Sequence, residues 1–292
     1  MNIRRFIGRL SKESWNIGFI DNSMGEIIDG ASLHVHLLKH KCEGSWFADP
    51  FVLDVTGDDI FLLVEEWQKD KRKGRISKLV VDRKKFYLKS IVPILELETH
   101  VSFPAIYRTG DCVFIYPESK NSRGLICYQY NNDVCTDAGV MCDDILADAV
   151  CSDLFGERLL FATREPYVNG KVLSIYSFDE NCGKYLLKDT FSFKENIARM
   201  AGSFFCYNGK IYRPAQESNH CYGHSVILQE VLYDDGKWTF RNVRRMKSSC
   251  PEMEDGMHTF NSYKGVIVTD ARRCNFLKKI REYIYFARSL AL

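Results

Sequence analysis

The sequence lacks the features that would place it in a membrane, on nucleic acid or outside the cell. Among its 292 residues no apolar run approaches the roughly 20 residues of a bilayer span, so we expect no membrane span. The formal net charge is only +2, which argues against a nucleic-acid partner. The first 20 residues hold no apolar core of about 7–15 residues, as a secretory signal would. We therefore expect a cytoplasmic protein.

Several motifs that carry chemistry are also missing. There is no Gly-x-Gly-x-x-Gly, P-loop or Gly-x-Ser-x-Gly sequence, which argues against dinucleotide, nucleoside triphosphate and serine-hydrolase chemistry. The 11 cysteines form no Cys-x-x-Cys pair, so they predict no zinc knuckle, and reduced thiols are favoured over a disulfide framework. His34, His36 and His40 have no accompanying carboxylate or cysteine motif. We expect no metal and no cofactor.

The chain does contain many short strand-like runs. Segments such as 60–67, 111–119 and 225–234 are rich in Val, Ile, Phe and Tyr and alternate with turns rich in Asn, Asp, Gly or Lys. The clearest helical periodicity lies in the C-terminal stretch 275–290. Together these patterns predict an all-β protein with a short C-terminal helix.

One layout occurs five times and narrows this prediction to one architecture. A small or polar cluster is followed by an apolar strand, a tight turn and a second strand with a polar end; the starts lie near 49, 103, 148, 200 and 258. Repeats of about 40–50 residues are typical of propeller blades. We therefore predict a single five-bladed β-propeller domain over residues 1–292, with the strand 14–21 closing the last blade. A β-sandwich with coincidental spacing is the alternative.

In a propeller the first strand of each blade lines the central axis, so the polar clusters at the blade starts should converge. Glu65 and Glu66 end one second strand, and we take Glu66 as the substrate-binding one. So many ionisable groups are costly to bury together unless they pair or bind something. This convergence is the main functional signal, and it comprises Asp49, His100, Asp148, Arg199 and His258 at the starts, with Glu66, Glu118, Arg213, Gln216 and Asp270 behind them.

Short motifs over nearly the whole chain, from about residue 14 to 270, carry a resemblance to known proteins. ADPF (48–51), SFPAIY (102–107) and the acidic and histidine blade starts resemble the five-bladed propeller glycosidases that include arabinanases and β-xylosidases. More closely, WNIGF (15–19), ARMAG (198–202) and MHTFN (257–261), in this order, resemble the N-terminal domain of plant glucosamine inositolphosphorylceramide transferases and its stand-alone bacterial relatives. Met200 replaces the usual proline, and no glycosyltransferase-type domain is seen, so the plant activity does not carry over.

The resemblance to the glycosidases implies roles for three carboxyl groups. Asp49 would be the catalytic base and Asp148 an orienting carboxylate. Inverting hydrolysis needs two carboxyl groups about 6.5–9.5 Å apart, one holding water and one protonating the leaving oxygen. The acid that these enzymes carry in blade four is absent from residues 198–200, and Glu118 is our substitute.

The remaining candidates would bind substrate. Arg199 and Arg213 favour an acidic or phosphorylated sugar, because a guanidinium binds carboxylate and phosphate in a bidentate manner; alternatively, each neutralises an acid of the same ring. For His258, the alternative to substrate binding is a structural role as a hydrogen-bonded residue. Candidates for stacking on sugar faces are Trp46, Trp67 and Tyr222, with packing between blades as the more usual role of such aromatic residues.

Two functional hypotheses remain open at this point. The first is a glycoside hydrolase-like protein acting on a small-molecule or glycan substrate. The second is a non-catalytic sugar or nucleotide-sugar recognition module in a glycan or glycolipid assembly pathway, with a glycosyltransferase as candidate partner. We expect a monomer in either case.

Overall fold

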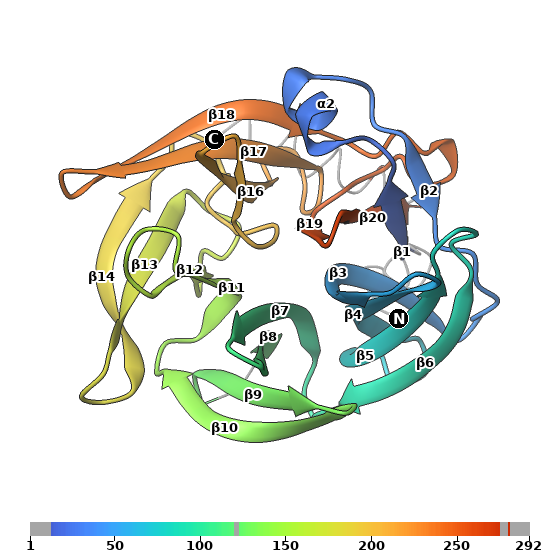
Figure 1. Cartoon of the computed structure of the whole chain (residues 1–292), viewed down its shortest axis with the longest axis horizontal. Helices are drawn as coiled ribbons and strands as arrows, with labels where there is room; N and C mark the ends of the chain where they lie inside the picture. The colour runs from blue at the N-terminus through green and yellow to red at the C-terminus, as the bar shows by residue number, and fades with distance from the viewer. Residues whose placement is uncertain (1–12, 120–122, 275–279, 281–292) are drawn as a thin grey trace.

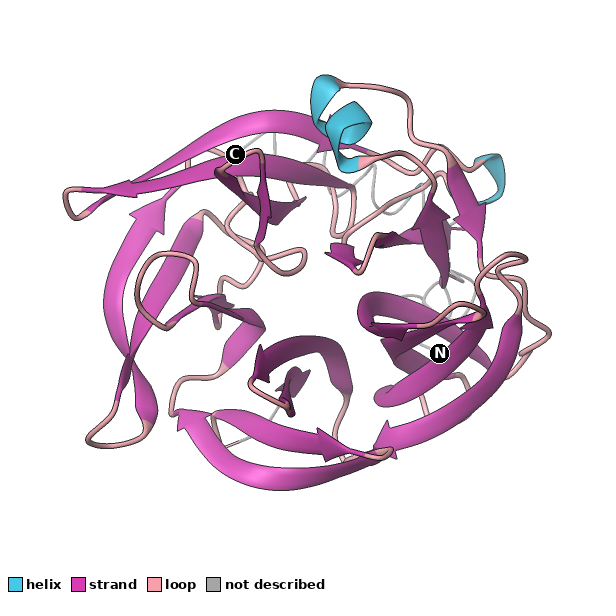
Figure 2. Ribbon diagram, viewed as in Figure 1, coloured by secondary structure: helices cyan, strands magenta, loops and turns pink. Residues whose placement is uncertain are grey.

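The computed structural model describes residues 13–119, 123–274 and 280, and shows a ring of five antiparallel sheets around a central axis (Figures 1 and 2). Each sheet has four strands and forms one blade, with its first strand near the axis and its last strand on the rim. The prediction of a five-bladed β-propeller is confirmed. The helix predicted over 275–290 lies outside the described residues except for Ile280.

The strands follow the chain blade by blade. Blade one contains β3 (Ser45–Val55), β4 (Asp59–Gln68), β5 (Lys73–Asp82) and β6 (Leu88–Leu95). Blade two contains β7 (Val101–Thr109), β8 (Cys112–Ser119), β9 (Leu125–Asn131) and β10 (Val134–Cys142). Blade three contains β11 (Leu146–Ser152), β12 (Leu159–Arg164), β13 (Val172–Asp179) and β14 (Lys184–Ser192). Blade four contains β15 (Phe205–Tyr207), β16 (Lys210–Glu217), β17 (Ser225–Asp234) and β18 (Lys237–Met246).

Blade five joins the two ends of the described chain. It is ordered β19 (Phe260–Tyr263), β20 (Val266–Cys274), β1 (Glu13–Ile20) and β2 (Val35–Leu37). β1, the strand predicted over 14–21, pairs antiparallel with β20 from Glu13 opposite Cys274 to Ile20 opposite Ile267. This pairing covers two strand edges that would otherwise be open to another chain.

Little helix is present among the described residues. α2 (Met24–Asp29) begins with a capping box, in which the Ser23 and Glu26 side chains each bond the other's backbone N–H, and ends at Gly30 with φ of 99°. A short 3₁₀ turn covers Pro251–Met253. No helix in the described part of the chain is long and apolar enough to cross a membrane.

The hydrophobic core is divided among the blade interfaces. Four clusters of buried side chains each join two neighbouring blades, such as Phe19 and Val268 with Leu62 between blades five and one. The fifth cluster extends over blades one to four and includes Phe161 and Trp238. Burying one such side chain contributes about 1.5–3 kcal/mol. The apolar side chains thus hold blade against blade. The 11 cysteines are all free thiols, and they range from buried to exposed.

Candidate functional site

Backbone bulges direct the polar side chains of the first strands toward the axis. Asp49, Phe103 and Asp148 have φ of 51°, 47° and 47°, and each lies where the pairing of its strand with the next one shifts register. A residue in this left-handed region costs about 1–3 kcal/mol unless its surroundings hold it there. Here side-chain carboxylates do so: the backbone N–H groups of Asp49, Phe103 and Asp148 donate to Asp270, Asp49 and Glu118 respectively.

Asp270, near the middle of β20, organises one half of the axial cluster. Its carboxylate accepts hydrogen bonds from the backbone N–H groups of Asp49, His258 and Thr259, and from the Thr259 hydroxyl. His258 lies between two carboxylates, with Nδ1 2.7 Å from Asp270 and Nε2 3.3 Å from Asp49. Its ring also lies 4.2 Å from that of Trp15. Burial alone would lower the pKa of His258, but Asp270 and Asp49 outweigh it and raise that pKa.

Arg199 organises the other half of the cluster. Its Nε and Nη2 donate to both carboxylate oxygens of Asp148, Nη2 also donates to Glu118 at 2.8 Å, and Nη1 donates to Asn169. Gln216 donates to Asp148 as well. Burial opposes a charge here, but Asp148 and Glu118 raise the pKa of the guanidinium well above its ordinary value. The charge of Arg199 is therefore already compensated by two acids of the protein.

Asp49, Glu65 and Asp270 have no arginine partner in the described structure, and the first two are the ones whose pKa is raised. Asp49 and Glu65 come from adjacent strands, because Ala48 pairs with Glu65 across β3 and β4. Burial raises the pKa of Asp49 well above its usual range, against the lowering effect of His258, and Glu65 raises it further. Burial, followed by the charge of Glu118, likewise raises the pKa of Glu65. Both groups therefore favour the protonated form.

The family that matches this chain is the one that its sequence motifs resemble. The model of the family described as glucosamine inositolphosphorylceramide transferase 1, N-terminal, matches residues 34–266, which is most of the chain. The chain belongs to this family.

A curated relative is found in rice. The glucosamine inositolphosphorylceramide transferase 1 of Oryza sativa subsp. japonica is 24% identical over 196 residues, which cover 64% of this chain and 26% of that protein. This member of the family thus spans about a quarter of the length of the curated relative it matches.

The fold of this family member is also found in solved structures of low sequence identity. A GH43 β-xylosidase/α-arabinofuranosidase from a compost microbial metagenome superposes with a TM-score of 0.53 at 9% identity, covering 80% of this chain and 92% of that chain. GH43B of the Bacteroides ovatus xyloglucan PUL superposes with a TM-score of 0.50 at 12% identity, covering 76% and 47%. At such identities the likeness shows a shared fold.

The structure places five of the predicted site residues together at the axis. Asp49 and His258 lie in the Asp270 half of the cluster, and Glu118, Asp148 and Arg199 lie in the other half. The predicted alternative for Arg199, neutralisation of acids in the same ring, is what the geometry shows. The general-acid role assigned to Glu118 needs this ion pair to break first, because its carboxylate is held by Arg199.

Blade one departs from the prediction in one detail. Glu66 is buried beside the strands of its own blade, where Ser45, Arg75 and Ser77 hold its carboxylate, so its placement does not support substrate binding. Glu65 faces the axis instead, with its carboxylate 3.7 Å from His100 Nε2. Neighbouring strand residues point to opposite faces, and the sequence alone left the choice between the two open.

Blade four holds two more predicted residues, and neither offers a free polar group to solvent. Arg213 is fully buried, bonds the carbonyl groups of Ile197 and Ala198 and the Gln229 side chain, and burial lowers its pKa to about 9. Gln216 is also fully buried; besides Asp148 it bonds the Met200 carbonyl. Arg213 therefore supports the backbone before Arg199, and Gln216 positions Asp148.

For Tyr222 the sequence left two roles open, stacking on a sugar and packing between blades, with packing as the more usual one. Its side chain is 40% exposed, and its ring lies 5.2 Å from that of His258 and 5.4 Å from the Arg199 guanidinium. Tyr222 thus covers both halves of the axial cluster and presents an aromatic surface beside them. The short YGH sequence around it (222–224) carries no periodicity that separates it from a packing residue.

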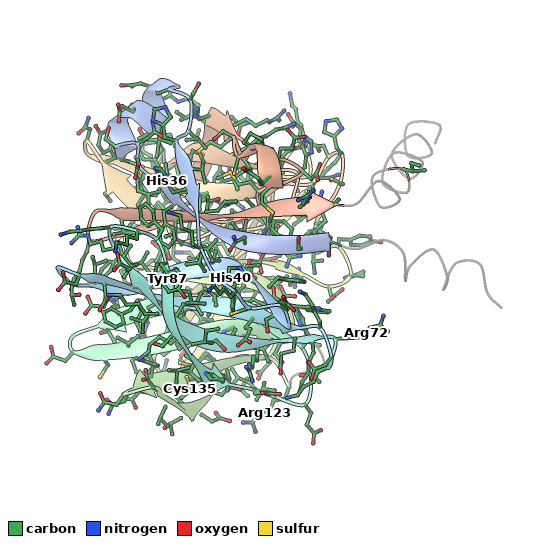
Figure 3. The ribbon with its side chains drawn as sticks, turned by 90° about the vertical axis from the view of Figure 1, so that its right-hand side faces the viewer. His36, His40, Arg72, Tyr87, Arg123 and Cys135 are labelled. Carbon is green, nitrogen blue, oxygen red and sulfur yellow. The ribbon has the colours of Figure 1, made fainter. Side chains whose placement is uncertain are left out.

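The cluster also brings together a set of groups with metal-ligand chemistry. One donor atom each from Asp49, His258 and Asp270 lie within 4.8 Å of one another, a grouping the sequence did not predict. However, Asp270 already accepts four hydrogen bonds and both His258 nitrogens face carboxylates. These contacts favour an ion-paired histidine over a metal centre. His36 and His40 lie at the outer side of the ring (Figure 3), and His36 pairs with Asp21.

Proposed function

We propose that this protein binds a glycan at the axial cluster and cleaves a glycosidic bond there, with Asp49 as base and Glu65 as proton donor. The observation that carries the proposal is that Asp49 and Glu65, on adjacent strands, are both buried with raised pKa values, and that Glu65 disfavours ionisation of Asp49. Coupled carboxyls of this kind favour a state in which one is protonated and the other ionised, which supplies an acid and a base at neutral pH. The fold shared with GH43 enzymes supports the same chemistry by analogy.

The hydrogen bonds around the pair favour one assignment of the two roles. Asp49 receives a hydrogen bond from the Phe103 backbone N–H and faces His258, and both groups favour its ionised form. Glu65 lies beside His100, whose side chain is 27% exposed. The ionised Asp49 would take a proton from the attacking water while Glu65 gives its proton to the leaving oxygen, as in inverting hydrolysis.

We propose a neutral sugar as the substrate. An acidic or phosphorylated sugar was expected from Arg199 and Arg213, but Arg213 is buried away from solvent and Arg199 already binds two carboxylates. The acids of the cluster outnumber its cations, so they would repel an anionic sugar and would accept hydrogen bonds from hydroxyl groups. The exposed Tyr222 ring offers the flat surface on which a sugar face packs.

The test compares matched single variants on a panel of oligosaccharides and aryl glycosides. Glu65→Gln and Asp49→Asn should each lower turnover by about 10²–10⁴-fold, since each removes an acid–base group, while sugar-induced thermal stabilisation remains. Glu66→Gln is the control, because its carboxylate is held by blade one and should not affect turnover beyond its effect on stability. Full turnover in Glu65→Gln would refute its role as proton donor.

A second candidate function is non-catalytic sugar recognition, and one observation favours it. Arg199 occupies both Asp148 and Glu118, so the second half of the cluster is built as a fixed scaffold of ion pairs. The matching rice protein is a transferase by name, and a recognition domain of this kind would serve a glycosyltransferase partner. Stabilisation of the wild-type protein by sugars, with no product after long incubation, would select this function over hydrolysis.

A further inference from the structure

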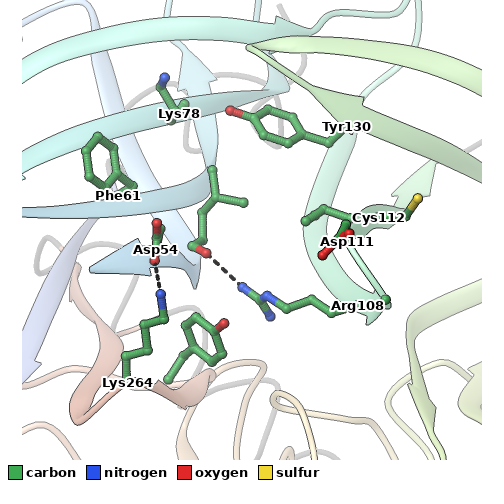
Figure 4. Close-up of a pocket in the computed structure, with 12 residues that line it drawn as sticks. Asp54, Phe61, Lys78, Arg108, Asp111, Cys112, Tyr130 and Lys264 are labelled. Atoms are coloured by element: carbon green, nitrogen blue, oxygen red, sulfur yellow. Dashed lines mark hydrogen bonds and ion pairs between the residues drawn. The ribbon is translucent and has the colours of Figure 1, made fainter. Parts of the chain in front are cut away.

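A pocket of about 620 Å³ lies at the opposite end of the inner strands from the axial cluster (Figure 4). It opens where the turns after β3, β7 and β19 meet, and it is as large as typical small-molecule sites. On β3, Asp49 belongs to the axial cluster and Asp54 lines the pocket. Five residues of strand separate them by roughly 15 Å, so the two sites are distinct.

The pocket contains an arginine whose hydrogen bonds are incomplete. Arg108, on β7, is half-buried; its Nη2 donates to the carbonyl groups of Val52 and Leu53 at 2.9 Å each, and its guanidinium stacks 3.9 Å from the Tyr263 ring centre. Its Nε and Nη1 make no hydrogen bond, and it forms no ion pair, with any residue in the described ranges. Nη2 belongs to both open edges of the guanidinium, so the free donors Nε and Nη1 lie on different edges. Each of them can donate a charge-assisted hydrogen bond to an oxygen of a carboxylate or phosphate group.

Among the described residues, Arg108 is the cation of the pocket that forms no ion pair. Lys264 pairs with Asp54 at 2.6 Å, and Lys78 pairs with Asp133. Asp111 lies on the turn that begins β8, exposed to solvent, and makes no ion pair with Arg108 in the described structure. An anion entering the pocket would therefore meet the guanidinium of Arg108, which attracts it, and the exposed carboxylate of Asp111, which repels it.

The apolar part of the lining indicates the rest of the ligand. Phe61 and Tyr130 lie on either side of the opening in Figure 4, and Leu53 and Val113 complete the lining. These side chains can bury a small apolar or aromatic body while its charged end reaches Arg108. A fully hydrated ion would leave this surface uncovered.

We propose that this Arg108 pocket, lined by Arg108, Tyr263, Phe61, Tyr130, Leu53 and Val113, is a second binding site for a small organic anion. The ligand carries a carboxylate or phosphate group on an apolar or aromatic body. The guanidinium of Arg108 binds the anionic group, and the aromatic and aliphatic side chains bind the body. This site does not depend on the activity proposed for the axial cluster.

Calorimetric titration with benzoate, phenyl phosphate, inorganic phosphate and uncharged benzyl alcohol tests the proposal on the full chain. Benzoate or phenyl phosphate should bind at least tenfold more tightly than benzyl alcohol, and the stronger of the two identifies the anionic group. Binding of phenyl phosphate no tighter than inorganic phosphate would overturn the role of the apolar lining. Absence of any binding up to about 10 mM would overturn the site.

Four variants locate the binding. Arg108→Lys keeps the charge but loses the planar array of N–H donors and should weaken binding at least fivefold; Val113→Phe narrows the pocket without touching the guanidinium and should weaken it similarly. Asp111→Asn removes the like charge and should strengthen binding about two- to fivefold. Lys264→Gln, at the rim, should change it less than threefold. Unchanged affinity in both Arg108→Lys and Val113→Phe, with native thermal unfolding, would overturn the proposal.

Discussion

The two halves of the axial cluster neutralise their buried acidic groups in different ways. In one half, Arg199 holds Asp148 and Glu118 in a fixed ion-pair network. In the other half, the cation that faces Asp49 and Asp270 among the described residues is His258, whose charge depends on pH. Arginine keeps its proton at all working pH values, whereas imidazole and an unpaired carboxyl do not. The comparison separates a structural half from a half that can exchange protons.

Removal of the arginine should have the largest effect. Arg199→Met leaves two buried carboxylates without a counter-charge, and we expect a loss of about 3–5 kcal/mol in the free energy of unfolding. Urea denaturation at neutral pH measures it. Arg199→Lys keeps a charge without the bidentate geometry and should lose less. A loss below about 1 kcal/mol for Arg199→Met would show that the network does not stabilise this half.

A smaller effect is expected in the histidine half. Asp270→Asn keeps the shape but removes the charge and part of the acceptor capacity that Asp49, His258 and Thr259 use. We expect a loss of about 1–3 kcal/mol. Because Asp270 raises the pKa of His258, that pKa should also fall, as followed by NMR titration of the imidazole. An unchanged His258 pKa would contradict the pairing.

The acids with raised pKa values predict how the free energy of unfolding changes with pH. The folded-state pKa of Glu65 lies above its ordinary value of 4.5, so its favourable contribution is complete below about pH 4.5 and is lost as pH rises through the folded pKa. In Glu65→Gln this loss should disappear, making the decline of unfolding free energy shallower by up to about 1.4 kcal/mol per pH unit. Parallel pH profiles for wild type and variant would count against a raised pKa.

The smallest effect should come from an ion pair outside the cluster. Arg123 and Asp137 pair at 3.2 Å on the surface, with side chains 65% and 49% exposed. Arg123→Gln should cost about 0.5 kcal/mol or less, since solvent already screens the pair. Differential scanning calorimetry provides the baseline for the buried pairs, and a cost similar to that of Arg199→Met would remove the contrast between burial and exposure.

Much of the fold followed from the sequence because the repeat is local. Asp49, Phe103 and Asp148, chosen as equivalent positions from the chain alone, are the three residues with matching left-handed bulges. This left-handed geometry is repeated in blades one to three; Met200 and His258, chosen as the starts of blades four and five, do not share it. The extent of the single domain over residues 1–292 stays a prediction, as does the monomeric state.

The roles within the site were less accessible to sequence reasoning. The choice between Glu65 and Glu66 depends on which face of β4 meets the axis. Because two glutamates follow one another, the alternation of polar and apolar residues does not show which of them faces it. Arg199 and Arg213 look equally suited to a ligand in the sequence, yet one meets carboxylates and the other backbone carbonyls. The Arg108 pocket depends on three turns distant in the chain. Each of these outcomes is set by tertiary packing.

The pairing of β1 with β20 has a consequence for how the chain is made. Trp15 lies opposite Arg272, so β1 finds its partner only after the chain has been synthesised beyond residue 272. Blades one to four can form as they leave the ribosome, while β1 must wait with its backbone unpaired. Such distant pairing slows folding. The pairing of β1 with β20 should therefore follow the folding of blades one to four, and the Asp270 half of the axial cluster takes its final form at that step.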